Sequence, residues 1–284
     1  MGEWREAVLA ALGNGINFFD TADAYGDGFA EEQLGDVLRE AGVRDDVIVA
    51  TKFYWHVEDG GDRYYPDTRA DYLLRACEAS LRRLKTDHID LYQIHAWDPL
   101  IRPEEVGAAF EKLRQDGKVR WFGVSNWNAG QMALGRAHFP LATLQPKYNL
   151  LDREAEASIF PYCLEHQIGT LVYSPLERGL LGGHCHPGQE FSDSRAKNPL
   201  FQGKRFEGLL KGIDQLRPLA EEAGLTIAQF ALRWTLTHPA VTCAILGVKS
   251  ARHLAAAPAA EDVLPQDVWH LAARIMEKAA GTPA

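Results

Sequence analysis

Ile89-Asp90-Leu91-Tyr92-Gln93-Ile94 is a short, mostly apolar run without strict alternation of polar and apolar residues. Such a run is typical of a β-strand that is buried on both faces, as in a parallel sheet. Helical patterns lie on either side of it, over residues 71–84 and 104–115. Because strands that alternate with helices define the α/β class, this stretch predicts a parallel sheet covered by helices.

Runs of the same kind recur along the whole chain. The other predicted strands are residues 16–20, 47–51, 119–124, 143–145, 170–173 and 243–246. The other predicted helices are residues 4–12, 31–41, 128–137, 153–166, 207–223, 226–236, 251–257 and 265–278. Most strand ends are separated by about 20–45 residues, which is the size of one βα unit in a barrel. We therefore predict a single α/β domain over residues 1–284, a (β/α)8 TIM-type barrel.

The number of strands departs from that fold. Seven strands can be identified, and the chain opens in a helical pattern that leads into the first of them. A parallel barrel needs every strand to be paired on both sides, so we expect an N-terminally truncated barrel with two open edges. The long interval between residues 173 and 246 holds an extra loop, residues 184–205, for which we predict a mobile lid.

Composition limits the partners of the protein. The 284 residues include 30 Lys and Arg against 39 Asp and Glu, a net charge of −9, which repels nucleic acid and anionic membranes. No apolar run approaches the ~20 residues that a membrane span needs, and no signal peptide is recognised. We expect a cytoplasmic protein that acts on small molecules.

The four cysteines support the same expectation. They are Cys77, Cys163, Cys185 and Cys243, and none forms a C-x-x-C pair. In a chain of this size we interpret them as reduced thiols. His184, Cys185 and His186 could reach a metal together, but no fourth ligand follows at a suitable spacing, so we predict no metal site.

Polar residues mark the carboxyl ends of the strands, where the active site of a parallel barrel is built. In chain order they are Asp20, Tyr25, Lys52, His95, Ser125, Asn126, Gln145, Tyr173, Ser174, Gly247 and Lys249. A lysine ammonium beside a tyrosine favours the phenolate form, and a carboxylate behind the lysine keeps it charged. A tyrosine placed in this way can act as a general acid toward a developing alkoxide, while a histidine orients the carbonyl oxygen.

Asp20-Thr21-Ala22-Asp23-Ala24-Tyr25-Gly26 resembles the signature of the aldo-keto reductases. Other segments of this chain resemble later sequence blocks of that family, in the family's order, and together they extend along nearly the whole chain. They are Thr51-Lys52, Ser80-Leu81-Arg82-Arg83-Leu84, Ile89-Asp90-Leu91-Tyr92-Gln93, Ile94-His95, Gly123-Val124-Ser125-Asn126, Gln145 and Tyr173-Ser174-Pro175-Leu176.

The resemblance implies an oxidoreductase that reduces an aldehyde or ketone to an alcohol by direct hydride transfer from NADPH. Tyr25 would be the general acid or base, Asp20 and Lys52 would tune it, and His95 would orient the carbonyl group of the substrate. No metal would be required.

The resemblance also implies a set of cofactor contacts. Ser125, Asn126 and Gln145 would hold the nicotinamide carboxamide, and Tyr173 would stack on the ring. Ser174, Leu176, Gly179, Leu180 and Leu181 would lie along the pyrophosphate. Gly247, Lys249, Ser250 and Arg252 would lie near the adenosine 2′-phosphate. That basic cluster favours NADPH, with NADH as the alternative, because a phosphate dianion is best matched by Lys or Arg.

Several of these residues also have a purely structural interpretation. Taken singly, Asp20 could be a loop carboxylate, Lys52 a solvated strand end and His95 a core histidine. The aromatic residues that follow strands either line an apolar substrate pocket or simply pack in the core. They are Tyr54, Trp55, Trp97 and Trp127.

Two departures from the family pattern keep other functions open. The usual β-hairpin and first barrel strand are absent before Met1, and residues 254–257 read Leu-Ala-Ala-Ala where the family has a Glu and an Asn at the adenine. One alternative is a non-catalytic, cofactor-binding regulatory or remnant protein. Another is a Schiff-base lyase that uses Lys52. A partner chain, as in a homo-oligomer, could cover the open edges.

Overall fold

Seven strands form one sheet in the computed structural model, which describes residues 2–57, 64–248, 250–260 and 262–281. Their order along the sheet is their order along the chain. They are β1 (Phe18–Asp20), β2 (Ile48–Phe53), β5 (Ile89–Ile94), β6 (Val119–Ser125), β7 (Thr143–Gln145), β8 (Gly169–Tyr173) and β9 (Val241–Ile245). All neighbouring pairs from β1 to β8 are parallel. The predicted parallel sheet and its seven strands are confirmed over the described residues.

The helices alternate with these strands as predicted. They are α1 (Gly2–Gly13), α2 (Phe29–Ala41), α3 (Ala70–Leu84), α4 (Pro103–Gln115), α5 (Ala129–Arg136), α6 (Ile159–Glu165), α7 (Gly203–Glu222), α8 (Ile227–Thr237) and α9 (Gln266–Ala280). A capping box begins α8, because the Thr226 side chain accepts from the backbone N–H of Gln229 and the Gln229 side chain accepts from the backbone N–H of Thr226.

Two predicted helices are wrong in part, and proline explains the first. The segment 153–166 divides into a 3-10 turn, Glu154–Glu156, and α6. Pro161 has no N–H to donate to the carbonyl of Ala157, so the α-helix cannot extend further toward the N-terminus. The segment 251–257 belongs to a 3-10 helix, Ala251–Ala260, and not to an α-helix.

A two-stranded antiparallel sheet follows β2 and was absent from the sequence prediction. It pairs β3 (Trp55–Val57) with β4 (Tyr64–Pro66). The signal that could have found it is the sequence Asp59-Gly60-Gly61-Asp62, which is rich in turn-forming residues and lies between two aromatic segments.

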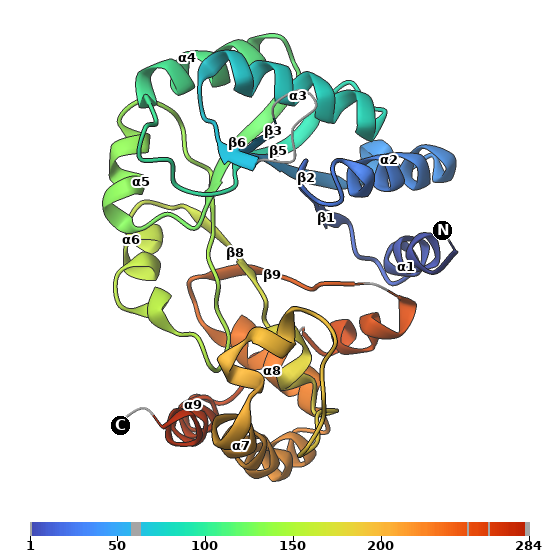
Figure 1. Ribbon diagram of the computed structural model, residues 1–284, viewed down its shortest axis with the longest axis vertical. Helices are drawn as coiled ribbons and strands as arrows, with labels where there is room; N and C mark the ends of the chain where they lie inside the picture. Colours follow the sequence, from blue (N-terminus) through green and yellow to red (C-terminus); the bar gives the residue numbers. More distant parts are fainter. Residues whose placement is uncertain (1, 58–63, 249, 261, 282–284) are drawn as a thin grey trace. The chain divides into compact units, whose positions relative to one another are not determined.

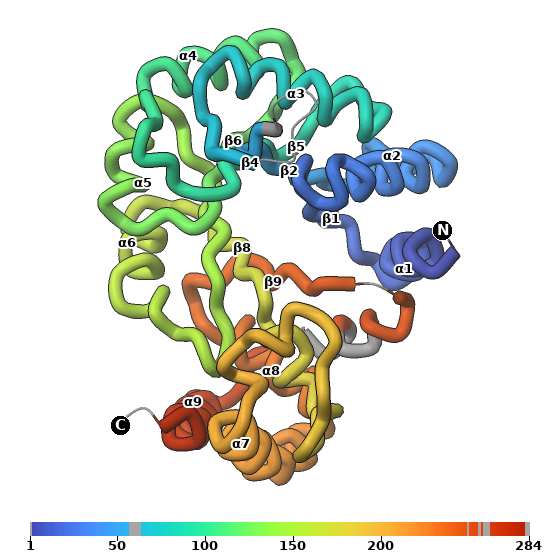
Figure 2. The backbone as a smooth tube through the Cα atoms, in the orientation of Figure 1, coloured from blue at the N-terminus to red at the C-terminus, as the bar shows by residue number. Residues whose placement is uncertain are grey.

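The chain divides into two compact units. The first consists of residues 1–146, 158–170 and 248–252, and the second of residues 147–157, 171–247 and 253–284. In the first unit α2, α3 and α4 follow one another on the outer side of the strands, as Figure 1 shows. In the second unit α7 packs against both α8 and α9, as can be followed in Figure 2.

Each unit has a specific packing contact between its helices. In the first, α2 approaches α3 so closely at Gly35 that an added Cβ would lie 2.4 Å from the carbonyl oxygen of Leu84. In the second, the rings of Trp234 and Trp269 stack with their centroids 5.1 Å apart. Each of these indole N–H groups donates to the backbone carbonyl of the other residue, at 2.9 and 3.0 Å. Large aromatic side chains with satisfied N–H groups hold such contacts tightly.

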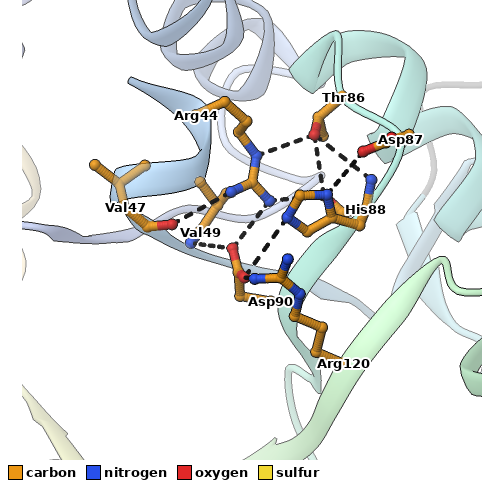
Figure 3. A network of polar contacts seen from close by, with 8 residues as sticks. All are labelled: Arg44, Val47, Val49, Thr86, Asp87, His88, Asp90 and Arg120. Atoms are coloured by element: carbon orange, nitrogen blue, oxygen red, sulfur yellow. Dashed lines mark hydrogen bonds and ion pairs between the residues drawn. The ribbon is translucent and has the colours of Figure 1, made fainter. Parts of the chain in front are cut away.

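A buried polar network ties the amino ends of three strands in the first unit (Figure 3). The carboxylate of Asp90 accepts from the backbone N–H of Val49 at 2.9 Å and from Arg120 at 2.6 Å. Arg44 lies 2.9 Å from the same carboxylate and donates to the hydroxyl of Thr86 at 3.0 Å. A buried carboxylate with this many partners stabilises the fold, because its charge is fully compensated.

The predicted lid contains short helices. Ser194–Lys197 and Pro199–Phe201 are 3-10 turns, and both begin at side-chain caps, Asp193 and Asn198. Mobility of residues 184–205 stays a prediction.

Membrane insertion and disulfide bonding find no support in the described part of the chain. No helix there is both long and apolar enough to cross a membrane. None of the four cysteines, all of which lie in the described residues, forms a disulfide bond.

Candidate active site

Asp20 and Lys52 form a buried ion pair at the carboxyl ends of β1 and β2. The Lys52 Nζ atom lies 2.5 Å from Asp20 Oδ2 and donates to the backbone carbonyl of Thr21 at 2.8 Å. The Lys52 side chain is fully buried, and that of Asp20 is 6% exposed. An ammonium is tolerated at this depth because it is paired and hydrogen-bonded. An ion-paired ammonium is also a poor nucleophile, which argues against the lyase alternative.

Tyr25 lies beside this pair at the surface. It belongs to the loop after β1, and its ring centroid is 5.4 Å from Lys52 Nζ. The residue is 44% exposed, in contrast to the buried lysine. The ring of His95 meets the ring of Tyr25 edge to face, with centroids 5.7 Å apart. The four residues predicted to move a proton are therefore neighbours.

His95 is held as a neutral imidazole. It follows β5 directly, and its backbone N–H donates to the carbonyl of Phe53 at 3.0 Å. Burial, together with the charge of the nearby Lys52 ammonium, lowers the pKa of His95 to about 4. Its Nδ1 atom is buried and has no hydrogen-bond partner among the described residues. A neutral imidazole has one donor and one acceptor nitrogen, so it can donate to a carbonyl oxygen.

Ser125, Asn126 and Gln145 complete a hydrogen-bonded cluster with these residues. The Ser125 hydroxyl donates to the Gln145 carbonyl at 2.9 Å, and the Asn126 amide donates to the backbone carbonyl of His95 at 3.1 Å. The Gln145 amide donates to Asp20 Oδ1 at 2.9 Å. Asn126 adopts a left-handed conformation with φ 59°, which turns its amide back toward the strand ends. Seven predicted site residues thus come together in the first unit.

The predicted contacts from Tyr173 to Leu181 lie in the second unit. Tyr173 ends β8, and burial raises its pKa. Ser174 has φ 56°, and its carbonyl accepts from the amide of Asn149 at 2.9 Å. Leu176 precedes the 3-10 segment Glu177–Gly182, in which Gly179 has φ 89° and Leu180 and Leu181 are buried.

Three further predicted contacts follow β9 in the chain. Gly247 follows β9 and is exposed. Ser250 has a buried hydroxyl with no hydrogen-bond partner among the described residues. Lys249, on which the preference for NADPH depends, lies outside the described residues.

The structure adds a residue to the site that the sequence analysis missed. Gln93 is fully buried, and its amide lies 3.4 Å from Asp20 Oδ1. The signal was present in the sequence, because Gln93 stands two residues before His95 and alternate residues of a strand share a face.

The aromatic residues near the strand ends divide into two kinds. Tyr54 and Trp127 are buried, and the Tyr54 hydroxyl donates to the Trp97 carbonyl at 2.9 Å. Trp97 meets Trp127 edge to face at 4.8 Å. Trp55 is 38% exposed. The first two residues pack in the core, so Trp55 and the partly buried Trp97 are the ones that an entering ligand could touch.

Comparison with known proteins identifies the class. The family model described as "Aldo/keto reductase family" matches residues 2–276, so the chain belongs to the aldo/keto reductase family. This family generally binds NAD(P)H.

Individual relatives agree with that assignment. The chain is 40% identical over 254 residues to the aldo-keto reductase YhdN of Bacillus subtilis, covering 88% of this chain and 76% of that protein. It is 32% identical to a probable voltage-gated potassium channel subunit beta of Arabidopsis thaliana, covering 93% of this chain and 83% of that protein.

A solved structure fixes the fold class. The chain is similar to the glycerol dehydrogenase AKR11B4 from Gluconobacter oxydans, with a TM-score of 0.91 and 35% identity, over 99% of this chain and 86% of that one. The fold is therefore of the TIM-type barrel class, as predicted. Relatives named as reductases and dehydrogenases support carbonyl reduction as the general chemistry.

Proposed function

We propose that this protein is an NADPH-dependent aldo-keto reductase that reduces an aldehyde or ketone to an alcohol, with Tyr25 as the general acid. One observation carries the proposal. A fully buried, ion-paired Lys52 lies beside the ring of a half-exposed Tyr25, with Asp20 behind it and a neutral His95 next to it. This arrangement supplies a proton donor, a group that stabilises the donor after it has lost its proton, and a hydrogen bond for the carbonyl oxygen.

Each residue has a separate task in this reaction. Tyr25 donates its phenolic proton to the oxygen of the developing alkoxide. The Lys52 ammonium stabilises the phenolate that remains, and Asp20 holds that ammonium in place at 2.5 Å. His95 donates a hydrogen bond to the carbonyl oxygen and so orients the substrate.

The residues at the strand ends fit a nicotinamide cofactor. A carboxamide needs one hydrogen-bond acceptor and one donor, and a hydroxyl and two side-chain amides lie together at Ser125, Asn126 and Gln145. When bound, the cofactor supplies the hydride that adds to the carbonyl carbon.

The remaining cofactor contacts follow from the family resemblance. Within the second unit we assign the ring and pyrophosphate contacts to Tyr173, Ser174, Leu176, Gly179 and Leu181. We assign the 2′-phosphate to Gly247, Lys249 and Ser250.

Titration with NADPH and NADH tests the proposal, followed through quenching of tryptophan fluorescence. We expect micromolar binding of NADPH, clearly tighter than that of NADH, and turnover with some member of a panel of aldehydes and ketones. Lys249→Ala should weaken NADPH binding and leave NADH binding nearly unchanged, because it removes only the partner of the 2′-phosphate. Equal affinity for the two cofactors in both proteins would contradict the assignment.

A second function is favoured by one comparison. The similarity to a probable potassium channel subunit beta extends over 93% of this chain, so a cofactor-binding regulatory protein is the alternative. It predicts tight NADPH binding without turnover of any carbonyl compound in the panel. The arrangement of Tyr25, Lys52 and Asp20 favours the reductase.

Composition indicates the cellular compartment of the protein and the kind of molecule on which it acts. Four free cysteines are typical of a reducing compartment, so we infer a cytoplasmic enzyme. A net charge of −9 favours small carbonyl compounds or alcohols as partners over nucleic acid. A homo-oligomer is compatible with these inferences.

A further inference from the structure

A second buried charged group lies behind the catalytic cluster, on the other face of β2. The carboxylate of Glu31, on α2, is fully buried. It accepts from the Thr51 hydroxyl at 2.6 Å and from Arg83 Nε, on α3, at 2.6 Å. Thr51 stands next to Lys52 in the strand, and neighbouring residues of a strand point to opposite faces. Glu31 is therefore connected through one strand residue to the catalytic lysine.

Asp23 brings a second carboxyl group into the same space. Its backbone N–H donates to the carbonyl of Lys52 at 3.1 Å, and its Oδ1 atom is buried without a hydrogen-bond partner among the described residues. The charged and titratable groups that interact with Asp23 or Glu31 come from the loop after β1 and from β2, β5, α2 and α3. They are Asp23, Lys52, Tyr92, Glu31, Tyr72, Cys77 and Arg83.

These groups do not balance two negative charges. Arg83 is the cation that bonds directly to Glu31, while Lys52 is already paired with Asp20. Burial and the negative charge of Glu31 together raise the pKa of Asp23 to about 7, against the opposing charges of Arg83 and Lys52. A carboxyl group buried beside another negative charge is favoured in its protonated, neutral form.

Both acidic residues belong to the segment that carries Tyr25. The Tyr25 carbonyl accepts from the backbone N–H of Ala30 at 3.2 Å, and the Tyr25 N–H donates to the Ala22 carbonyl at 3.1 Å. Arg83 also lies directly on this segment, because a Cβ added at Gly28 would be 2.5 Å from Arg83 Cδ. Residues 23–31 are thus fixed from both ends. We call Asp23, Glu31, Thr51 and Arg83 the loop-anchoring cluster.

We propose that the loop-anchoring cluster positions Tyr25 beside Lys52 for proton transfer. The inference rests on the proposed reductase function. Ionisation of Asp23 adds a buried negative charge near that of Glu31, so the segment that carries Tyr25 loosens as pH rises. These residues act through Tyr25 and touch no reacting atom.

Thr51→Val and Thr51→Ser form a matched pair that tests the positioning role. Valine keeps the shape of the side chain and removes the donor to Glu31, whereas serine keeps the donor. We expect Thr51→Val to lower kcat about tenfold with little change in the Kd for NADPH, because small misplacements of a reacting group are costly. Thr51→Ser should recover most of the activity. Thr86→Val removes a comparable hydroxyl from the network of Asp90 and should leave kcat unchanged.

Asp23→Asn tests the role of the Asp23 proton, since asparagine imitates the protonated carboxyl group. The alkaline limb of the kcat profile should move upward by about one pH unit, because Tyr25 itself then limits activity. Asp23 holds a proton in the folded state that the unfolded state has lost between pH 3.8 and about 7, so its contribution to stability falls as pH rises through this window. In urea denaturation, the stability of Asp23→Asn should therefore rise more with pH across this window than that of the wild type.

Hydrogen exchange separates failure of this inference from failure of the reductase function. Thr51→Val should speed amide exchange over residues 23–31 but not over α4, and Thr51→Ser should not. Wild-type kcat, pH profile and exchange in Thr51→Val and Asp23→Asn would overturn the positioning role. A wild-type protein that turns over no carbonyl compound would contradict the reductase function, and the exchange experiment would still test the cluster. If Thr51→Val does not fold, Asp23→Asn carries both readouts.

Discussion

Two buried carboxylates in the first unit have equal exposure and different surroundings. Asp90, at the amino ends of the strands, and Asp20, at the carboxyl ends, each have side chains that are 6% exposed. Asp90 is surrounded by two arginines and a backbone N–H, and both of its oxygens have partners. Both oxygens of Asp20 also have partners, Lys52 on Oδ2 and side-chain amides on Oδ1, and beyond the lysine lies the half-exposed ring of Tyr25.

The two ion pairs differ in the kind of cation and in the groups that lie next to it. The guanidinium groups at Asp90 are planar and fix the starts of strands, which contributes to stability. The ammonium of Lys52 is compact, holds Asp20 on one side and lies near a titratable ring on the other. Beside it, Nδ1 of His95 is buried without a partner among the described residues. A fully paired group stabilises a fold, whereas a site for chemistry keeps polar atoms for a ligand.

Replacing Tyr25, which lies at the carboxyl ends of the strands, should reduce activity more than any other substitution that we propose. Tyr25→Phe removes the general acid and keeps the ring, so we expect kcat to fall by about 10²–10⁴-fold. The thermal midpoint and the Kd for NADPH should stay close to the wild-type values, because the hydroxyl lies at a half-exposed position. Steady-state kinetics and fluorescence titration measure both, and full activity in this variant would refute the role of Tyr25.

Replacing Asp90 should produce the opposite outcome. Asp90→Ala leaves two arginines without their carboxylate, and we expect the free energy of unfolding to fall by about 3 kcal/mol. Urea denaturation measures this loss. The kcat per folded molecule should not change, because the network lies at the other ends of the strands.

Arg120→Ala is the milder control for that experiment. Arg120 is 54% exposed, so its removal should reduce stability less than the removal of Asp90 does. A fall in kcat of Asp90→Ala that is independent of folding would mean that the two ends of the sheet are coupled.

The weakest effect that we expect is a dependence of the free energy of unfolding on pH, which arises from the burial of His95. Because the pKa of folded His95 is about 4 and that of an unfolded histidine is 6.5, the unfolded state binds more protons between these values. The free energy of unfolding should therefore be constant from His95 above pH 6.5 and fall as pH decreases toward 4. Asp23 contributes a slope of opposite sign in the same window, so the test is the difference between the two proteins. Relative to the wild type, His95→Asn should lose the part of the slope that rises with pH. An unchanged slope would mean that His95 is protonated in the folded protein.

Much of the fold could be predicted because its signals are local. Strands buried on both faces, such as Ile89–Ile94, are short apolar runs, and helices such as Ala70–Leu84 repeat apolar residues at helical spacing. The proline positions that divide residues 153–166 were visible in the sequence but were outweighed by its helical pattern. The hairpin of β3 and β4 is held by pairing between strands of three residues, for which local patterns are weakest.

The residues of the candidate site likewise include some that local sequence patterns predict and others that they do not. Asp20, Lys52, His95 and Gln145 could be predicted because each ends or directly follows a strand, and parallel strands bring their carboxyl ends together. Gln93, Asp23 and Glu31 could not, since each has an equally good interpretation as an ordinary strand, loop or helix residue.

The sequence by itself determined the class of fold, the order of the strands and the residues that stand at their ends. These depend on the alternation of strand and helix patterns along the chain, which is a local property. Tertiary structure alone decided which charged groups lie behind the strand that carries Lys52, because α2 and α3 bring Glu31 and Arg83 there. It also decided the pKa values of Asp23 and His95, because burial and the neighbouring charges are set only when distant segments pack together.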